Sequence, residues 1–193
     1  MRRTATAFVS VLGIALLTAT TGCSITGPGG TGTGPTASPS ASASAPASAD
    51  PGPRDEAARL QYLIEEEKLA HDVYQRFAQL WGEQVFSNIM ASEVTHQQLL
   101  VPLLASKGIP DPRSTSAGVF SDPEIQGLYD QLVQQGSASV IEAYKAGVTI
   151  EQKDIADLSA DLKTTTDAAT TTVMERLLAG SQNHLQAFES HLT

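Results

Sequence analysis

The sequence predicts an all-α protein, built as a bundle of four long helices with a fifth, short helix in the connection between the second and the third. Three observations lead to this fold class. From residue 54 onward, apolar side chains recur at alternating intervals of three and four residues, the pattern of helices that bury one face. The same region shows no convincing strand pattern. Gly and Pro stand between the periodic segments, where helices end.

Residues 1–22 have the pattern of a secretory signal peptide: two arginines, an apolar run over residues 5–19, and then small residues. The run is short for a membrane-spanning helix. Cys23, the only cysteine of the chain, follows directly and resembles the lipidation site of bacterial lipoproteins. That resemblance implies a lipid anchor on the extracytoplasmic face of the cell membrane. Thr20 stands where such sites usually carry an aliphatic residue, so simple secretion remains the alternative.

Residues 23–53 are predicted to form a disordered tether that begins with the lipidated Cys23. The segment 24–49 contains no charged and no aromatic residue and consists almost wholly of Gly, Ser, Thr, Pro and Ala. Such a composition cannot bury enough apolar surface to fold. The folded domain is therefore expected over residues 54–193, a normal size for one domain.

The charge of the chain excludes one class of partner. The sequence has 21 acidic and 12 basic residues, and every acidic residue lies at or beyond Asp50. Loss of the two signal-peptide arginines leaves 10 basic residues and a net charge near −11. Nucleic acid is a poor partner for that surface, whereas a cation is a good one. Because no cysteine follows Cys23, the domain has no thiolate ligand and no disulfide.

The first long helix is expected over about residues 55–80, before Gly82. One of its seven inward positions is charged, and it is Glu67. The second is expected over about residues 84–107, before Gly108. Its inward positions are Phe86, Ile89, Glu93, His96, Leu100 and Leu103.

The connection that follows contains the short helix. Ser121 and Glu124 have the spacing of a capping box, which predicts that Ser121 caps a helix running to about Gln135. The third long helix is expected over about residues 137–163, with Glu151 as the one charge on its inward face.

The fourth long helix is expected over about residues 167–192. Two helical registers fit its apolar residues, and His184 faces inward in both. Gly180 and Ser181 leave space one turn before this histidine.

Five polar residues thus interrupt four apolar seams: Glu67, Glu93, His96, Glu151 and His184. All five lie near the middle of their helices, so a bundle could bring them to one level. Burying even neutral polar groups without partners costs roughly 2–7 kcal/mol. A bound metal ion is the leading compensation. A metal-free network of paired carboxylates and imidazoles is the alternative.

These residues resemble the metal set of the ferritin-like superfamily, which uses a Glu on each of two helices and Glu-x-x-His on each of the other two. The resemblance implies that Glu67, Glu93, His96, Glu151 and His184 are metal ligands and that Tyr74 lies beside them. It also implies a ferritin-like fold with Fe or Mn, as one or two ions.

A closer resemblance is to the DUF2202 domain family, a ferritin-like family without an established activity. The resemblance spans about Arg59 to Phe188. It rests on stretches that include 66–70, 72–74, 86–89, Ser92-Glu93, Ile150-Glu151 and 183–185.

The chain departs from the superfamily pattern at Ser181, where a Glu is expected. The missing carboxylate could be replaced by Asp154, one turn after Glu151, or by His71, one turn after Glu67. His71 could instead pair with Glu67. Without a replacement, the second metal position is weak or absent.

Two functional hypotheses follow. The first is a metal-dependent oxidoreductase or metal-handling protein, acting on peroxide or metal ions outside the cytoplasm. The second is a tethered, metal-free module, either structural or binding a protein partner at the cell envelope.

Overall fold

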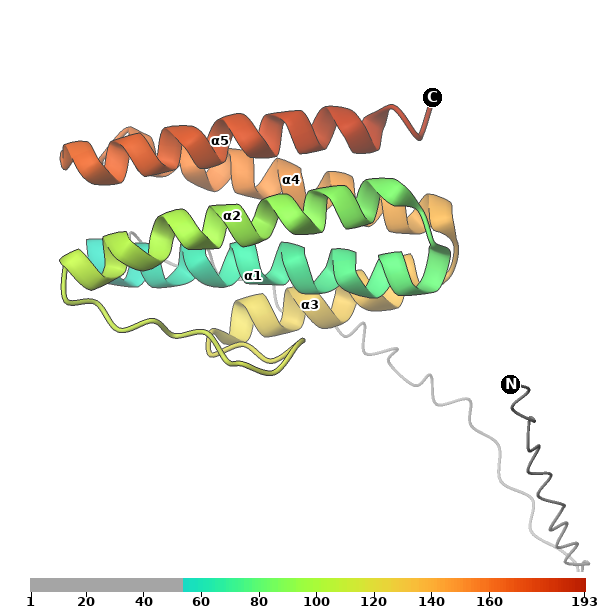
Figure 1. Cartoon of the computed structure of the whole chain (residues 1–193), viewed down its shortest axis with the longest axis horizontal. Coiled ribbons are helices and arrows are strands. Elements are labelled where there is room, and N and C mark those ends of the chain that lie inside the picture. The colour runs from blue at the N-terminus through green and yellow to red at the C-terminus, as the bar shows by residue number, and fades with distance from the viewer. Residues whose placement is uncertain (1–53) are drawn as a thin grey trace, which may run out of the picture. The chain divides into compact units, whose positions relative to one another are not determined.

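The computed structural model describes residues 54–193. The predicted signal peptide, Cys23 and the tether lie outside the described residues, so these remain predictions. The described part contains five helices and no strand (Figure 1). They are α1 (Glu56–Trp81), α2 (Gln84–Ser106), α3 (Pro123–Gly136), α4 (Val140–Leu162) and α5 (Ala168–Glu189). The predicted all-α bundle, with a short helix between the second and third long helices, is confirmed.

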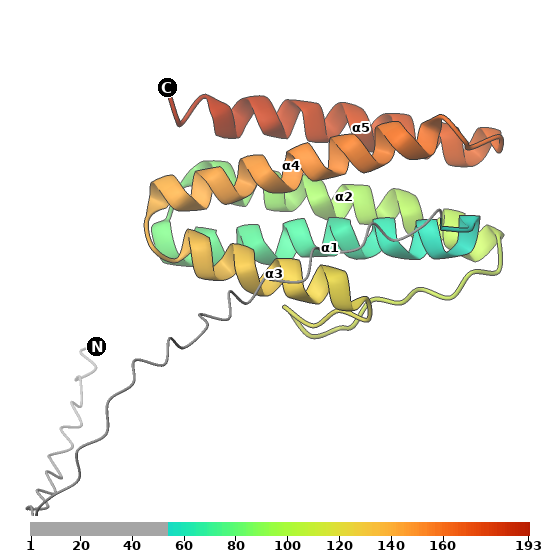
Figure 2. The same ribbon diagram turned by 180° about the vertical axis from the view of Figure 1, so that it is seen from behind.

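The four long helices form two hairpins that lie side by side (Figures 1 and 2). One hairpin is α1 with α2 and the other is α4 with α5, and α3 packs on α4 and α1. The segment 107–122, which we call the strap, follows α2 and leads to α3. α1 is enclosed by neighbours, and every residue from Tyr62 to Ala70 is buried. None of the described helices is both long and apolar enough to span a membrane.

Four of the five described helices, α1, α3, α4 and α5, are capped at their N-termini. In each, the side chain of the residue before the helix accepts a hydrogen bond from a backbone N–H of the first turn. The expected capping role of Ser121 is wrong. Asp122 caps α3, accepting from the backbone N–H of Glu124 at 2.8 Å, and Pro123 occupies the first helical turn. A carboxylate caps as well as a hydroxyl, and a proline lacks the N–H that a first-turn residue would leave unpaired. The Ser121 hydroxyl donates to the Pro112 carbonyl instead.

The core is divided along the length of the bundle into an aromatic and an aliphatic part. The aromatic part is centred on Tyr74, Phe77, Phe86 and Phe188. The aliphatic part contains leucines of α1, α2, α4 and α5 together with Met174. Each large apolar side chain buried in this way contributes on the order of 1.5–3 kcal/mol. The polar residues that interrupt the seams lie between these two parts, which hold them in place from both sides.

Candidate metal centre

The structure brings together all five residues that interrupt the apolar seams. Their ligand atoms form two groups, within each of which the atoms lie within 4.8 Å of one another. One group is Glu67, Glu93 and His96, and the other is Glu93, Glu151 and His184. All five residues are buried. Residues from four helices therefore converge on one centre, with Glu93 common to both groups.

Glu93 contacts one histidine through each of its carboxylate oxygens. Its Oε2 lies 2.8 Å from His96 Nδ1, and its Oε1 lies 2.8 Å from His184 Nδ1. Glu67 Oε2 lies 3.0 Å from His96 Nδ1, whereas Glu151 Oε2 lies 3.5 Å from His184 Nδ1. The two imidazole rings are nearly parallel, with centroids 5.3 Å apart. The half of the centre around His96 is thus the tighter one.

Several atoms of the centre are close to one another without forming hydrogen bonds. Glu67 Oε1, Glu93 Oε1, Glu151 Oε2 and His184 Nδ1 are buried and have no hydrogen-bond partner among the described residues. Glu93 Oε1 and His184 Nδ1 are close enough for a hydrogen bond, but their geometry does not make one. Leaving a buried polar group unpaired costs about 1–3 kcal/mol. Lone pairs that converge without bonding one another are what ligands of a common cation present.

Burial and the histidines act against each other on the pKa values of the centre. Burial raises the pKa of Glu67 well above its usual range, and it also raises the pKa of Glu151. For Glu93, burial acts in the same direction, but the imidazoles of His184 and His96 beside its carboxylate outweigh it and lower the pKa to about 2. Burial acts to lower the pKa of both histidines, but their carboxylate partners raise it to about 10 for His96 and about 9 for His184.

Three further residues position the ligands. The Tyr74 hydroxyl donates to Glu151 Oε1 at 2.6 Å, in the place expected for this tyrosine. Ser92 Oγ lies 2.9 Å from His184 Nε2, which leaves Nδ1 facing the carboxylates. A Cβ atom at Gly180 would lie 2.3 Å from His96 Nε2, so only glycine leaves room for that ring. The sequence indicated the space at Gly180 but not the role of Ser92. The helical period shows which residues of one helix share a face, and it does not show that a hydroxyl on another helix will meet His184.

Neither residue considered as a replacement for the missing glutamate belongs to the two ligand groups. Ser181 is buried, and its hydroxyl donates to the Leu177 carbonyl at 3.2 Å. Asp154 is buried, and burial followed by the charge of Glu66 raises its pKa well above its usual range. Its oxygens belong to neither of the two ligand groups.

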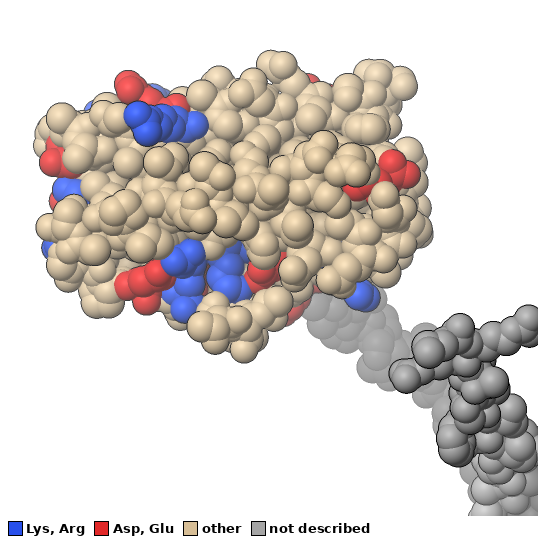
Figure 3. Space-filling model, in the orientation of Figure 1, with Lys and Arg blue, Asp and Glu red and all other residues tan. Residues whose placement is uncertain are grey.

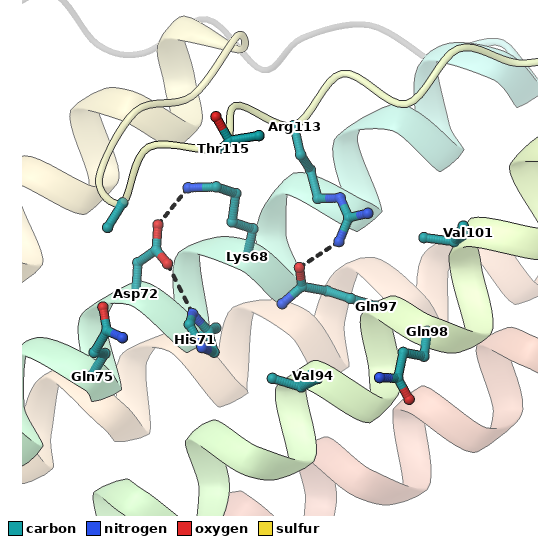
Figure 4. Close-up of a pocket in the computed structure, with 11 residues that line it drawn as sticks. Lys68, His71, Asp72, Gln75, Val94, Gln97, Gln98, Val101, Arg113 and Thr115 are labelled. Carbon is teal, nitrogen blue, oxygen red and sulfur yellow. Dashed lines mark hydrogen bonds and ion pairs between the residues drawn. The ribbon is translucent and has the colours of Figure 1, made fainter.

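His71 faces away from the centre. Its Nδ1 lies 2.9 Å from Asp72 Oδ1, so the suggested pairing with Glu67 is wrong, and Glu67 pairs with His96 instead. The His71 ring lines a pocket of about 500 Å³ between α1, α2 and the strap (Figure 4). His71 and Glu67 are one helical turn apart, as expected. Their contacts with residues other than each other are decided by the segments that pack on either side of α1.

Comparison with known proteins identifies relatives of the domain. The family described as "Uncharacterized protein domain (DUF2202)" matches residues 56–193. The uncharacterized protein MJ0754 of Methanocaldococcus jannaschii is 43% identical over 139 residues, which cover 72% of this chain and 75% of that protein. The crystal structure of hypothetical protein MJ0754 superposes with a TM-score of 0.68 at 42% identity, covering 74% of this chain and 83% of that chain. The chain therefore belongs to the DUF2202 family.

Proposed function

We propose that the protein is a ferritin-like metal protein whose centre holds Fe or Mn and acts in oxidation, peroxide handling or metal-ion handling. The observation that carries the proposal is the convergence of buried carboxylate and imidazole atoms that have no hydrogen-bond partner. Carboxylate oxygens and imidazole nitrogens together suit Fe and Mn. When bound, such ions supply redox and Lewis-acid chemistry.

The ligand groups favour two positions of unequal strength. Glu93 would contribute to both positions, since each of its oxygens faces a different histidine. The position formed by Glu67, Glu93 and His96 has contacts of 3.0 Å or less and would hold the firmer ion. The position formed by Glu93, Glu151 and His184 includes the longer contact, and one turn before His184 the chain has Ser181 where the superfamily pattern has a further carboxylate. Tyr74 and Ser92 would orient Glu151 and His184.

The location proposed for this activity is the extracytoplasmic face of the cell membrane. It rests on the signal-peptide pattern of residues 1–22, on Cys23 directly after it, and on the uncharged composition of residues 24–49. A tether of that length would hold the domain near the membrane while leaving it free to rotate.

A metal-free structural or partner-binding module is the competing proposal, and the short contacts between histidines and carboxylates favour it. His96 Nδ1 is within 3.0 Å of two carboxylates, as in a buried ion pair. This network, however, leaves Glu67 Oε1 and Glu151 Oε2 without partners. A cation would engage those oxygens, and a proton shared between histidine and carboxylate does not.

The deciding experiment measures bound metal in the full chain before and after incubation with Fe(II) or Mn(II), and follows near-ultraviolet absorbance when Fe(II) is added in air. We expect tightly bound Fe or Mn in the wild type and its loss in His96→Ala and Glu67→Gln. His71→Ala is the matched control and should keep its metal, because that ring contacts Asp72.

Stability in the presence of metal provides a second readout. A ligand present at a hundred times its Kd stabilises the folded state by about 2.7 kcal/mol. The wild type and His71→Ala should gain stability on addition of metal, and His96→Ala should not. Equal metal content and equal stabilisation in all variants would refute the metal centre and favour the metal-free network.

A further inference from the structure

Asp154 is a buried carboxylate that belongs to neither ligand group of the centre. It lies on the inner face of α4, one turn from Glu151, and is 3% exposed. Among residues 54–193 its side chain forms no hydrogen bond and no ion pair. After burial, the charges of Glu66, Glu67 and Glu151 act most strongly to raise its pKa. Asp154 is therefore an unpaired carboxylate close to both Glu66 and the centre.

Three carboxylates follow one another along α4 from the surface to the centre. Asp157, Asp154 and Glu151 are three residues apart, so each lies about 4.5 Å along the helix axis and about 60° around it from the one before. Their exposure falls in the same order. The Asp157 side chain is 38% exposed, whereas Asp154 and Glu151 are 3% and 0% exposed. α4 thus carries a row of carboxylates from solvent to a residue of the centre.

α1 adds a further carboxylate to this row. Glu66, which precedes Glu67 of the centre, is 3% exposed. Its Oε1 accepts from Lys153 Nζ at 2.7 Å, and Lys153 also donates to Asp157 at 2.5 Å. The Lys153 side chain is 26% exposed, and its flexible stem lets the ammonium turn outward. A cation that arrives at Asp157 would take the place of the ammonium at Glu66, so that Glu66 keeps a positive partner.

The opposite side of the centre offers no such row. His184, the most exposed of the five predicted ligands at 8%, lies on that side, where α5 meets α2. Glu93 is the only charged residue of α2, and it belongs to the centre. Figure 3 shows this side of the molecule, with charged side chains at its edges and few along α2. An ion that has shed its water is costly to bury unless charged groups accompany it, so the side between α1 and α4 is the favoured way in.

We infer that divalent cations reach the centre between α1 and α4, along a path formed by the carboxylates of Asp157, Glu66 and Asp154. The inference rests on the proposed metal centre and assigns these three residues to transfer of the ion, not to its final binding. None of the three belongs to a ligand group, in agreement with this role. A path that serves entry also serves release, and affinity is the ratio of the two rates. Loss of the path therefore slows both rates and leaves the affinity unchanged.

Uptake and release of Mn(II) by the full chain test the path. Free Mn(II) is followed by its electron paramagnetic resonance signal after rapid mixing with the metal-free protein, and release is followed after addition of excess chelator. Asp154→Asn and Glu66→Gln keep the size of the side chain and remove its charge. Because a charged path raises the rate of ion entry by roughly tenfold or more, both variants should be slower by that factor in uptake and in release. The amount of Mn(II) bound at equilibrium should stay at the wild-type level.

Asp157→Asn and Glu175→Gln form a matched pair of surface variants. Each change removes one negative charge from an accessible position, but Glu175 lies on α5, away from the path. Asp157→Asn should slow uptake of Mn(II), and Glu175→Gln should leave it at the wild-type rate. The pair separates the path from a general effect of net charge. Circular dichroism checks that each variant keeps its helices.

The possible outcomes distinguish the path from the centre itself. A wild type that binds no Mn(II) would refute the proposed function and the path with it. Wild-type rates in both Asp154→Asn and Glu66→Gln, or equal slowing by Asp157→Asn and Glu175→Gln, would overturn the path and leave the centre in place. A smaller amount of bound Mn(II) with an unchanged rate of uptake in Asp154→Asn would make Asp154 a ligand and would also overturn the path.

Discussion

Two groups of buried charged residues include side chains of α1, and they satisfy their polar atoms in different ways. The first is the candidate metal centre, to which α1 contributes Glu67. The second, which we call the strap latch, consists of Glu65, Lys68 and Asp72 on the side of α1 that faces the strap. These three latch residues are at most 7% exposed, and the residues of the first group are buried as well. Burial alone therefore does not distinguish a binding site from a structural contact.

The atoms of the strap latch are paired with backbone groups of the strap. Glu65 accepts from the backbone N–H groups of Ser121 and Asp122 at 2.7 and 2.8 Å. Asp72 accepts from Lys68 and from the Gly118 N–H, and Lys68 also donates to the Ser116 carbonyl. In the metal centre, oxygens of Glu67, Glu93 and Glu151 have no such partners. Paired buried charges hold a structure together, whereas the unpaired, converging ones are the basis of the proposed metal site.

The largest expected effect is on folding stability in the strap latch. Asp72→Ala removes the partner of the buried Lys68 amine and of the Gly118 N–H. Breaking a buried ion pair on one side costs about 3–5 kcal/mol. Urea denaturation should show this loss, while metal content stays normal in the protein that remains folded.

Asp111→Ala is the control for that measurement. Asp111 pairs with Arg113 on the exposed surface of the strap, where an ion pair contributes about 1 kcal/mol or less. If Asp72→Ala and Asp111→Ala were equally stable, the contrast between the latch and the surface would be wrong.

The next largest effect is on metal affinity. Ser92→Ala removes the group that orients His184 through Nε2, and loss of such a partner lowers metal affinity roughly 10–100-fold. Competition with a chelator of known affinity measures the change. Ser92→Thr keeps the hydroxyl and should restore most of the affinity. An unchanged affinity in Ser92→Ala would mean that His184 is held by packing alone.

The last prediction concerns the pH dependence of the stability of the metal-free protein. The pKa is raised to about 10 for His96 and to about 9 for His184, so the folded state holds more protons than the unfolded state above the ordinary histidine pKa near 6.5. The stabilisation is complete below about pH 6.5 and is lost as the pH rises toward 9–10. Unfolding free energy should fall by up to about 1.4 kcal/mol per pH unit for each histidine.

Unfolding curves between pH 6 and 10, recorded with chelator, measure that slope. His96→Ala should have a shallower slope than the wild type, and His71→Ala should match the wild type. Bound metal replaces the protons on the histidines, so the metal-loaded protein should lose the slope and should bind metal more tightly as the pH rises. A wild-type slope that His96→Ala leaves unchanged would show that the centre does not hold these protons.

Much of this arrangement could be predicted from local patterns. The alternation of three and four residues located the four long helices, and its polar interruptions named the residues that converge in the two ligand groups. These features follow from the helical period, which decides which residues share a face.

Other features could not be predicted, because they depend on contacts between distant segments. His71 and Glu67 are four residues apart, but they do not pair with each other. His71 contacts Asp72, and Glu67 contacts His96. Asp122 rather than Ser121 caps α3, and Glu65 accepts the backbone N–H groups of both. A helical period cannot say which of two adjacent polar residues meets a neighbouring segment.

The sequence by itself determined the helices, the level of the polar layer and its five residues, since period and composition are local properties. The tertiary structure alone decided that Glu93 is shared between two histidines, that Ser92 orients one of them, and that Gly180 makes room for the other. These features depend on distances between helices, and those distances are set by how the aromatic and aliphatic side chains pack on either side of the centre.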